Sequence, residues 1–270
     1  MAASSFASIG GFRTHYHHAG SGPVLLMLHG QLPGSDAAVE FGGMIDTFAE
    51  AGFAVFAPDL AGFGLTDNPA DYAIEARIAH VRAFIDFIGS ERVAIWGSSM
   101  GTYIGAQLAL EDRRIDRLVV QPSSVLPPPA TQPAPSASPN VGALVHQYTP
   151  SLENARALLT LVLANPAALT DDLVQRFFEA SSGKNVEAER QRRLAPRPKP
   201  LHGELHRLAI PSLLLWGMND PASTPERALL LMAGMPHAEL HLLHRCGHWP
   251  QRDQPARTRH LVNDFLRAPV

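Results

Sequence analysis

The residues with the clearest capacity for chemistry form a glycine-flanked run, Gly97-Ser98-Ser99-Met100-Gly101. A serine on a tight turn between a buried strand and a helix can act as a nucleophile, because the turn exposes its hydroxyl and the helix amides stabilise negative charge. Such a turn leaves no room for side chains two positions before or after the nucleophile. Ser99 has glycine at both positions, whereas Ser98 has Trp96 and Met100 there. Ser99 is therefore the candidate nucleophile, and the alternative is an ordinary turn serine.

A serine hydroxyl needs a general base, and the chain has thirteen histidines. His248 follows Gly247 in a loop between the last predicted strand and the last predicted helix, which favours it as the base; a packed or exposed loop histidine is the alternative. The base needs a carboxylate to fix its tautomer. Asp220, just past another predicted strand, completes the chain order Ser, Asp, His. Asp220 could instead only shape the turn before Pro221, and Asp253 is a rival for its role.

Acyl transfer also needs N–H donors for a developing oxyanion. We expect one from the backbone amide of Met100, the residue after the candidate nucleophile. The other is expected from the amide of Gln31, in the loop His29-Gly30-Gln31-Leu32-Pro33-Gly34. Both donors are backbone groups, so the side chain at Gln31 is weak evidence either way. The alternative is that His29 and Gly30 merely shape the loop.

A second glycine-rich turn spans residues 59–67, Asp-Leu-Ala-Gly-Phe-Gly-Leu-Thr-Asp. It lacks the Lys-Ser/Thr ending and the glycine spacing of a phosphate loop, so we interpret it as structural, with Asp59 hydrogen-bonding the turn. His15, His17 and His18 have no cysteine or carboxylate partners at suitable spacing, and we expect them to be solvated. No metal site and no cofactor are predicted.

Six apolar runs ended by turn residues must position these candidates. They are Val24–Leu28, Ala54–Ala57, Val93–Trp96, Leu118–Val120, Ser212–Trp216 and Glu239–Leu243. Continuous apolar runs of this length are typical of parallel strands covered on both faces. Helix-like segments alternate with them, at Ile74–Ile88, Gly101–Leu110 and Ala256–Leu266. The pattern predicts an α/β fold with a doubly wound, mostly parallel sheet.

The strand rhythm breaks after Val120 and resumes at Ile210. Residues 122–139 are rich in Pro, Ser and Ala and should form no regular element. Helical stretches follow at Ser151–Leu163 and Thr170–Ser181. We interpret 126–207 as an inserted helical lid, and 1–125 with 208–270 as the α/β core. A disordered linker is the alternative, but the leucine and phenylalanine content of this region opposes it.

Composition excludes several classes of function. A length of 270 residues fits one large α/β domain, alone or with an insertion, and an apolar content of 46% allows a substantial core. The formal charge of −3 and the scattered basic residues give no basic face for nucleic acid or an anionic membrane. The single cysteine, Cys246, fits a reducing compartment. Without a signal-peptide core or a bilayer-spanning apolar run, we expect a cytoplasmic protein whose partner is a small-molecule substrate.

With these residues assembled, the sequence resembles the α/β-hydrolase superfamily over nearly its whole length. It is most similar to the meta-cleavage-product hydrolases, which hydrolyse carbon–carbon bonds in aromatic ring degradation. Residues 29–34 resemble that family's His-Gly-x-Gly-Pro-Gly loop, and residues 59–67 its Asp-x-x-Gly-Phe-Gly-x-[ST]-Asp turn. Ser99-Met100-Gly101 matches the family's nucleophile turn, and Cys246-Gly247-His248-Trp249 matches a run common in it.

The resemblance implies an apolar substrate pocket under the lid, and a homodimer is possible because many members dimerise. The residues expected at the pocket come from the loop after the first long strand, from the lid and from the position after the base: Gly30, Leu32, Phe177, Phe178 and Trp249.

The departures from the family pattern fall at substrate-reading positions. Ser98 stands where the family has Asn before the nucleophile, and Glu40 aligns with a second pocket Asn. Phe177 aligns with a lid Arg that pairs with the substrate carboxylate or dienolate, and Arg176 is one residue away. A shift of one residue on a helix rotates a side chain by about 100 degrees, so Arg176 is a poor substitute. These departures favour a less charged substrate.

The sequence thus predicts a serine hydrolase that forms and then hydrolyses an acyl-enzyme, acting on a small, largely apolar ester, lactone or diketone. The first alternative is the carbon–carbon bond hydrolysis of the meta-cleavage-product family. The others are a cofactor-free lyase or oxygenase, a ligand-binding receptor that retains the triad, and a scaffold with an inert triad.

Overall fold

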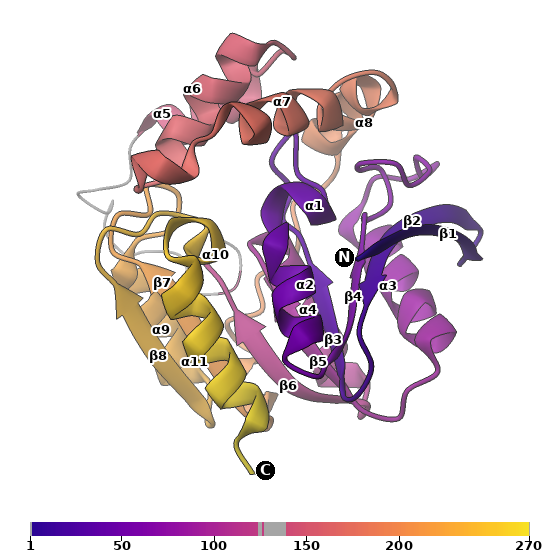
Figure 1. Ribbon diagram of the computed structural model, residues 1–270, viewed down its shortest axis with the longest axis vertical. Coiled ribbons are helices and arrows are strands. Elements are labelled where there is room, and N and C mark those ends of the chain that lie inside the picture. The colour runs from indigo at the N-terminus through magenta and orange to yellow at the C-terminus, as the bar shows by residue number, and fades with distance from the viewer. Residues whose placement is uncertain (1, 124–125, 127–138, 270) are drawn as a thin grey trace.

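The computed structural model describes residues 2–123, 126 and 139–269. Within these residues one sheet has the strand order β1-β2-β4-β3-β5-β6-β7-β8 (Figure 1). The strands are β1 (Ala3–Ile9), β2 (Phe12–Ala19), β3 (Val24–Leu28), β4 (Ala54–Pro58), β5 (Val93–Gly97), β6 (Ile115–Val120), β7 (Ser212–Gly217) and β8 (Ala238–Leu243). Strands β3 to β8 pair in parallel, which confirms the predicted mostly parallel α/β sheet.

The first two strands form an antiparallel hairpin at one edge of the sheet, and β2 pairs antiparallel with β4. The sequence prediction did not include this hairpin. Its strands carry serines and histidines rather than a continuous apolar run, because an edge hairpin is largely open to solvent and buries few of its side chains.

Both faces of the inner parallel strands are covered, as their apolar sequences predict, whereas the edge strand β8 leaves Glu239 and Leu242 exposed. In β3, Leu26 and Leu28 pack into one core cluster, whereas Leu25 and Met27 pack into the other. The first cluster contains side chains of α3 (Ile74–Ile88), α4 (Met100–Glu111) and α9 (Pro225–Gly234). The second contains side chains of α2 (Gly43–Glu50) and α11 (Pro255–Arg267).

Strand β3 lies between β4 and β5, so the chain leaves it in one direction along the sheet and later returns on its other side. The loops that follow β3 and β5 diverge at this switch point, where open α/β sheets form their ligand crevice. The loop after β3 carries Gly30 and Gln31, and the turn after β5 carries Ser99. The topology therefore brings the candidate nucleophile and the candidate oxyanion loop to the same crevice.

Four helices of the predicted lid lie above this end of the sheet (Figure 1): α5 (Pro139–Gln147), α6 (Leu152–Val162), α7 (Asp171–Ala180) and α8 (Lys184–Leu194). Apolar side chains of α5, α6 and α7 share a cluster with Val39 and Trp249 of the core. Phe177 sits directly on Gly34, because a β-carbon on Gly34 would lie 2.2 Å from the Phe177 carbonyl oxygen. The Asn185 amide donates to the Gly64 carbonyl at 3.0 Å, which ties α8 to the glycine-rich turn.

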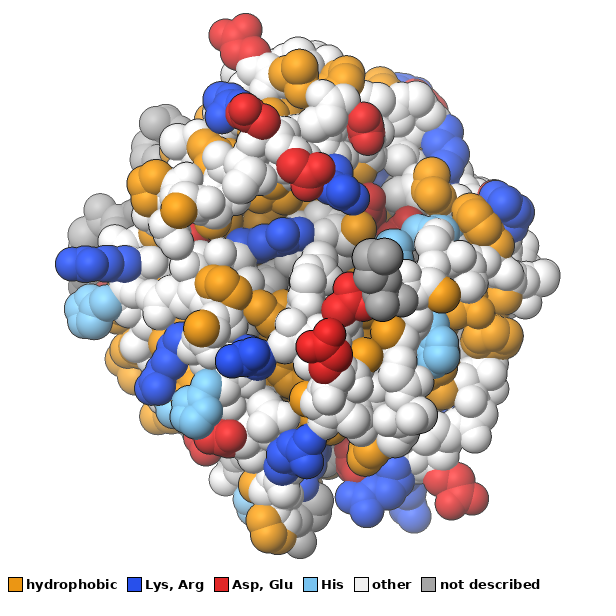
Figure 2. All heavy atoms as spheres, in the orientation of Figure 1, with side chains coloured by type: hydrophobic (Ala, Val, Ile, Leu, Met, Phe, Trp, Pro, Cys, Tyr) orange, Lys and Arg blue, Asp and Glu red, His pale blue; other side chains and the backbone are white. Residues whose placement is uncertain are grey.

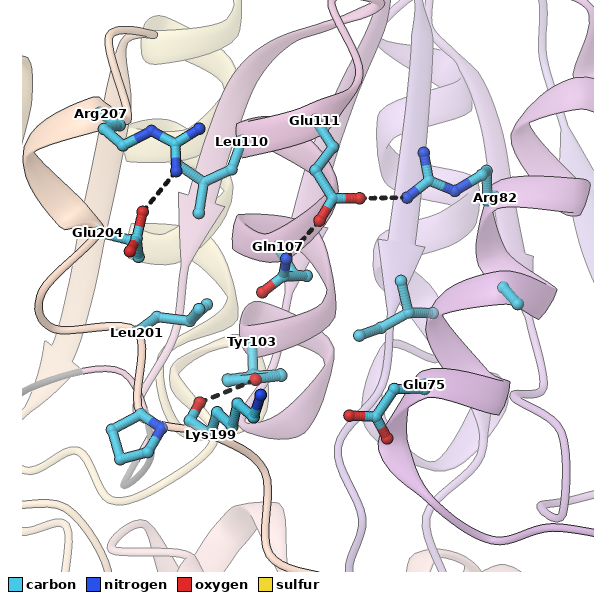
Figure 3. A pocket seen from close by; sticks show the side chains of 13 residues that line it. Glu75, Arg82, Tyr103, Gln107, Leu110, Glu111, Lys199, Leu201, Glu204 and Arg207 are labelled. Carbon is cyan, nitrogen blue, oxygen red and sulfur yellow. Dashed lines mark hydrogen bonds and ion pairs between the residues drawn. The ribbon is translucent and has the colours of Figure 1, made fainter.

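The chain between α8 and β7 packs on the core (Figure 3). The Tyr103 hydroxyl of α4 donates to the Lys199 carbonyl at 2.9 Å, beside a groove of about 600 Å³ between α3, α4 and this segment. Leu201 and Leu205 belong to the core cluster of the sheet. We therefore place the end of the lid at Leu194, earlier than the predicted 207. The predicted start at 126 borders residues 127–138, which lie outside the described part of the chain.

The turn at residues 59–67 is held by a buried carboxylate, as predicted. Asp59 accepts hydrogen bonds from the Leu65 amide at 2.9 Å and from His15 Nδ1 at 2.7 Å. Burial raises the pKa of Asp59, but the hydrogen bond and charge of His15 outweigh this and lower it. His15 is buried on β2, so the prediction that it is solvated is wrong.

Two buried histidines beside this turn are neutral. The Leu60 amide donates to His29 Nε2 at 2.9 Å, and the Ala61 amide donates to His80 Nδ1 at 3.3 Å, so these ring nitrogens carry no proton. Burial lowers the pKa of each ring to about 4.

The unfolding free energy should fall as the pH drops from about 6.5 to about 4, because unfolded histidine binds a proton near pH 6.5 and the folded rings do not. The expected loss is about 3 kcal/mol per histidine. Denaturant titrations of wild type and His80→Gln across this range test it. The variant should show a shallower pH dependence, and an equally steep one would contradict a neutral His80.

The contact between the lid and Gly34 can be tested with two adjacent phenylalanines. Phe177 has 0% exposure, whereas Phe178 is half-buried in the same cluster. Phe177→Ala should lower the unfolding free energy by about 3 kcal/mol or more, because it leaves a cavity between the lid and Gly34. Phe178→Ala is the matched control and should cost less. Equal losses in denaturant titrations would show that the contact at Gly34 does not hold the lid.

Figure 2 shows basic and acidic side chains interspersed on one face of the molecule, without a large field of either sign. Across the described ranges, every helix is too short or too polar to cross a lipid bilayer.

Candidate active site

Ser99 occupies a strained turn between β5 and α4. Its φ of 51° and ψ of −111° place a non-glycine residue in a region that L-residues rarely adopt. A β-carbon on Gly97 would lie 2.4 Å from Thr102 backbone atoms, and one on Gly101 would lie 2.0 Å from the Leu28 carbonyl oxygen. Glycine is therefore required on both sides of Ser99 for the steric reason that singled it out in the sequence.

His248 and Asp220 meet in the loops that follow β8 and β7. His248 Nδ1 lies 2.8 Å from Asp220 Oδ2, and the two residues are only 5% and 2% exposed. A carboxylate accepts at this position, so Nδ1 carries the proton and Nε2 is left as the basic nitrogen. The other oxygen, Oδ1, accepts from the amides of Ala222 and Ser223. Asp220 thus shapes its own turn and contacts the histidine, so the two interpretations of this residue are compatible.

Asp253, the rival carboxylate, makes different contacts. It lies in α10 (Pro250–Asp253) and accepts from the Gly247 amide at 2.6 Å and the Asn165 amide at 2.9 Å. The amide of His248 donates to the Val162 carbonyl at 2.7 Å. Asp253 therefore joins the histidine loop to the chain that follows α6, while Asp220 alone of the two contacts the imidazole.

Two opposing effects set the pKa of His248. Burial is the largest single effect and lowers it, because a charged ring is poorly solvated there. The charge and hydrogen bond of Asp220, with a smaller contribution from Glu40, outweigh burial and raise the pKa above its ordinary value. The ring is therefore a stronger base than an isolated buried histidine.

The candidate oxyanion loop lies beside Ser99. A β-carbon on Gly30 would be 3.0 Å from Ser99 Cβ. The Gly30 amide already donates to Glu40 Oε1 at 2.9 Å, so it is occupied. Neither the Gln31 amide nor the Met100 amide has an acceptor within the described ranges. Both predicted donors are thus free to bind an oxyanion.

The remaining predicted pocket residues gather under the lid. Leu32, Phe177, Phe178 and Trp249 all belong to the lid cluster or pack against it. Phe177 and Trp249 have 0% exposure. Neither side chain has accessible surface in this structure, so both pack the lid against the core, and their place in the substrate pocket stays a prediction.

Arg176 lies on the exposed side of α7. It pairs with Asp172 at 2.8 Å, and its side chain is 55% exposed. It borders a cleft of about 310 Å³ that also contains Asp36 and Lys184. Arg176 therefore does not take the place of a cation under the lid. In the part of the chain described here, no group of three His, Cys, Asp or Glu side chains could hold a metal ion.

Glu40, which ends α1 (Ala37–Glu40), is part of the site although it is not among the predicted site residues. Its Oε1 accepts from the Gly30 amide at 2.9 Å and from the Ser35 hydroxyl at 2.5 Å. A buried carboxyl that holds the oxyanion loop leaves no motif of its own in the sequence; only its departure from the family pattern marked it.

Comparisons with known proteins show the family of this chain. The profile of the alpha/beta hydrolase fold matches residues 23–255. The chain is 30% identical to a 2-hydroxy-6-oxononadienedioate/2-hydroxy-6-oxononatrienedioate hydrolase of Burkholderia vietnamiensis, over 94% of this chain and 91% of that protein. It is 29% identical to a 2-hydroxy-6-oxo-6-phenylhexa-2,4-dienoate hydrolase of Burkholderia cepacia, over 94% and 91% of the two chains. A solved meta-cleavage product hydrolase of Pseudomonas fluorescens superposes with a TM-score of 0.86 and 27% identity, over 97% of each chain.

The chain belongs to the α/β-hydrolase fold family, and it is a hydrolase. Within that family it is close to the hydrolases of meta-cleavage products, which act on carbon–carbon bonds. The comparisons favour carbon–carbon bond hydrolysis, the first alternative drawn from the sequence, over the ester, lactone or diketone hydrolysis that the sequence departures favoured.

Proposed function

We propose that this enzyme hydrolyses a carbon–carbon bond next to the ketone of a 2-hydroxy-6-oxo-dienoic acid. The observation that carries the proposal is similarity over nearly the full length to hydrolases whose substrates have this skeleton. The substrate places a ketone, which a serine can attack, beside a chain that can stabilise the negative charge of the departing carbon.

His248 Nε2 removes the proton from Ser99 Oγ, which attacks the carbon-6 ketone. The amides of Gln31 and Met100 hold the oxyanion. The enol at carbon 2 becomes a ketone as its proton moves to carbon 5, and the bond between carbons 5 and 6 then breaks. The electron pair is delocalised through the oxo-acid chain onto the oxygen at carbon 2, which takes the proton from His248. Water, deprotonated by the same histidine, then hydrolyses the acyl-enzyme, so that one water is consumed and two acids are released.

A second candidate function is hydrolysis of an uncharged ester. Three positions favour it: Ser98, Glu40 and Phe177 stand where the resembled family has substrate-reading groups, and Arg176 is occupied with Asp172 at the surface. None of these residues presents a cation to a substrate carboxylate, and a buried anion at Glu40 would repel one.

Turnover of 2-hydroxy-6-oxo-6-phenylhexa-2,4-dienoate, compared with p-nitrophenyl acetate, separates the two candidates. We expect a higher kcat/KM for the dienoate, and product analysis should give benzoate. Ester turnover without any loss of the dienoate would overturn the carbon–carbon assignment and leave the ester assignment.

A further inference from the structure

The buried carboxyl of Glu40 lies next to the reacting serine. A β-carbon placed on Gly30 would be 3.0 Å from Ser99 Cβ and 3.1 Å from Glu40 Oε1. Ser99 and this carboxyl therefore flank the same point in the oxyanion loop. Glu40 has 0% exposure, so no bulk water screens its charge from a substrate held there.

Only one of the two Glu40 oxygens has hydrogen-bond partners. Oε1 accepts from the Gly30 amide and the Ser35 hydroxyl. Oε2 is buried and has no aligned partner among the described residues, and the same holds for the neighbouring Ser98 Oγ. A carboxylate oxygen that is buried and unpaired is costly, whereas a protonated one becomes a hydrogen-bond donor.

The charged groups around Glu40 do not neutralise it by direct contact. Arg252 of α10 is partly buried and acts on Glu40 through its charge, but its guanidinium donates to the carbonyls of Ala38 and Val39. Gln251 donates to the backbone carbonyl of Glu40 at 3.2 Å and leaves the carboxyl alone. His248 lies across the site and acts on Glu40 through its charge.

The protonation equilibrium of Glu40 follows from these contacts. Burial raises the pKa of its carboxyl. The hydrogen bonds from Ser35 and Gly30, the nearby Ser98 hydroxyl and the charge of His248 lower it, but they do not cancel the effect of burial. Asp36, at the start of α1, is a second carboxyl with a raised pKa, because burial and the nearby Asp59 bring it to about 8.

We propose that Glu40 determines specificity, so that the site accepts an anionic substrate when its carboxyl is protonated and rejects it when the carboxyl is ionised. The neutral form places no charge beside the reacting serine, and the ionised form repels a substrate carboxylate held there, because no bulk water screens its charge. The part of this inference that concerns the dienoate rests on the proposed function.

The experiment compares an anionic and a neutral substrate in the same enzyme as the pH changes. The ratio of kcat/KM for 2-hydroxy-6-oxo-6-phenylhexa-2,4-dienoate to kcat/KM for p-nitrophenyl acetate largely cancels the ionisation of His248. In the wild type the ratio should fall at least about tenfold between about pH 5 and about pH 9. In Glu40→Gln, whose amide mimics the protonated acid, the ratio should stay within about twofold.

Asp36→Asn is the matched control, because it removes the charge of the other carboxyl whose pKa is raised. Asparagine caps the start of a helix as well as aspartate does, so α1 should keep its N-cap. The ratio in Asp36→Asn should fall with pH as in the wild type. Ser35→Ala is a second test that does not rely on the folding of Glu40→Gln. It removes the 2.5 Å hydrogen bond that favours the ionised form of Glu40, so the fall in the ratio of the two kcat/KM values should move to higher pH.

A ratio that is constant with pH in the wild type, or that falls equally in Glu40→Gln, overturns the inference. Failure of the proposed function is recognised separately, by ester turnover without dienoate turnover at any pH. In that case inhibition of ester hydrolysis by benzoate and by neutral benzamide decides the role of Glu40. Benzoate should lose affinity relative to benzamide as pH rises in the wild type but not in Glu40→Gln, and a constant affinity ratio would overturn the inference.

Discussion

Replacement of Ser99 by alanine should lower kcat/KM by at least about 10⁴-fold, because no other group can form the acyl-enzyme. The same variant should lose labelling by a fluorophosphonate probe. Alanine has a β-carbon at the same strained φ of 51°, so the turn and the unfolding free energy should change little. Activity assays, probe labelling and denaturant titration measure the three effects.

Ser98→Ala is the control for this experiment. Ser98 precedes the nucleophile and its hydroxyl is buried, so probe labelling should persist in this variant. Labelling that survives in Ser99→Ala, or that disappears only in Ser98→Ala, would contradict the assignment of the nucleophile.

Asp220→Asn should lower kcat by about 10²- to 10⁴-fold, because an amide no longer holds the His248 tautomer whose Nε2 is basic. The pH profile should also change. Catalysis needs neutral His248, so kcat/KM rises with pH through the His248 pKa, which Asp220 raises. Without that charge the pKa falls, and the acidic limb of the profile should move to lower pH.

Asp253→Asn separates this effect from a general loss of order in the histidine loop. Asp253 binds the Gly247 and Asn165 amides and makes no contact with the ring, so its loss should lower the unfolding free energy. The acidic limb should stay at its wild-type position. A limb that moves in Asp253→Asn but not in Asp220→Asn would assign the orienting carboxylate to Asp253.

The parallel core of the fold could be predicted because its strands are buried on both faces. Runs such as Leu213–Trp216 are apolar throughout, and such runs have few alternatives to an interior strand. The hairpin of β1 and β2 could not be predicted in this way. The position of this hairpin depends on contacts between residues distant in sequence, such as His15 with Asp59, and no local sequence pattern predicts such contacts.

The candidate site likewise has one part that could be predicted from the sequence and one part that could not. Ser99 was predictable because steric exclusion at Gly97 and Gly101 is a local property of the chain. The choice between Asp220 and Asp253 was not settled by the sequence, since both carboxylates lie at turns near the base in space, and only the folded loops decide which one contacts His248.

The pocket residues were the least predictable part of the site. Phe177 and Trp249 are apolar and lie in the expected segments, but whether such a residue lines a cavity or closes it depends on how the lid packs. The bond that is cleaved was also not settled by the departures at Ser98 and Glu40, and it was the full-length similarity that favoured the carbon–carbon bond.

The two attachments of the lid have a mechanical consequence. Near α6, the chain is bound to the histidine loop through Asp253 and through the hydrogen bond from His248 to Val162. At α8, Asn185 binds the glycine-rich turn. The lid is therefore bound to the core at both ends and does not turn about a single hinge. A swing about either end would break the hydrogen bonds at the other end, and also the packing of Phe177 of α7 on Gly34 between them.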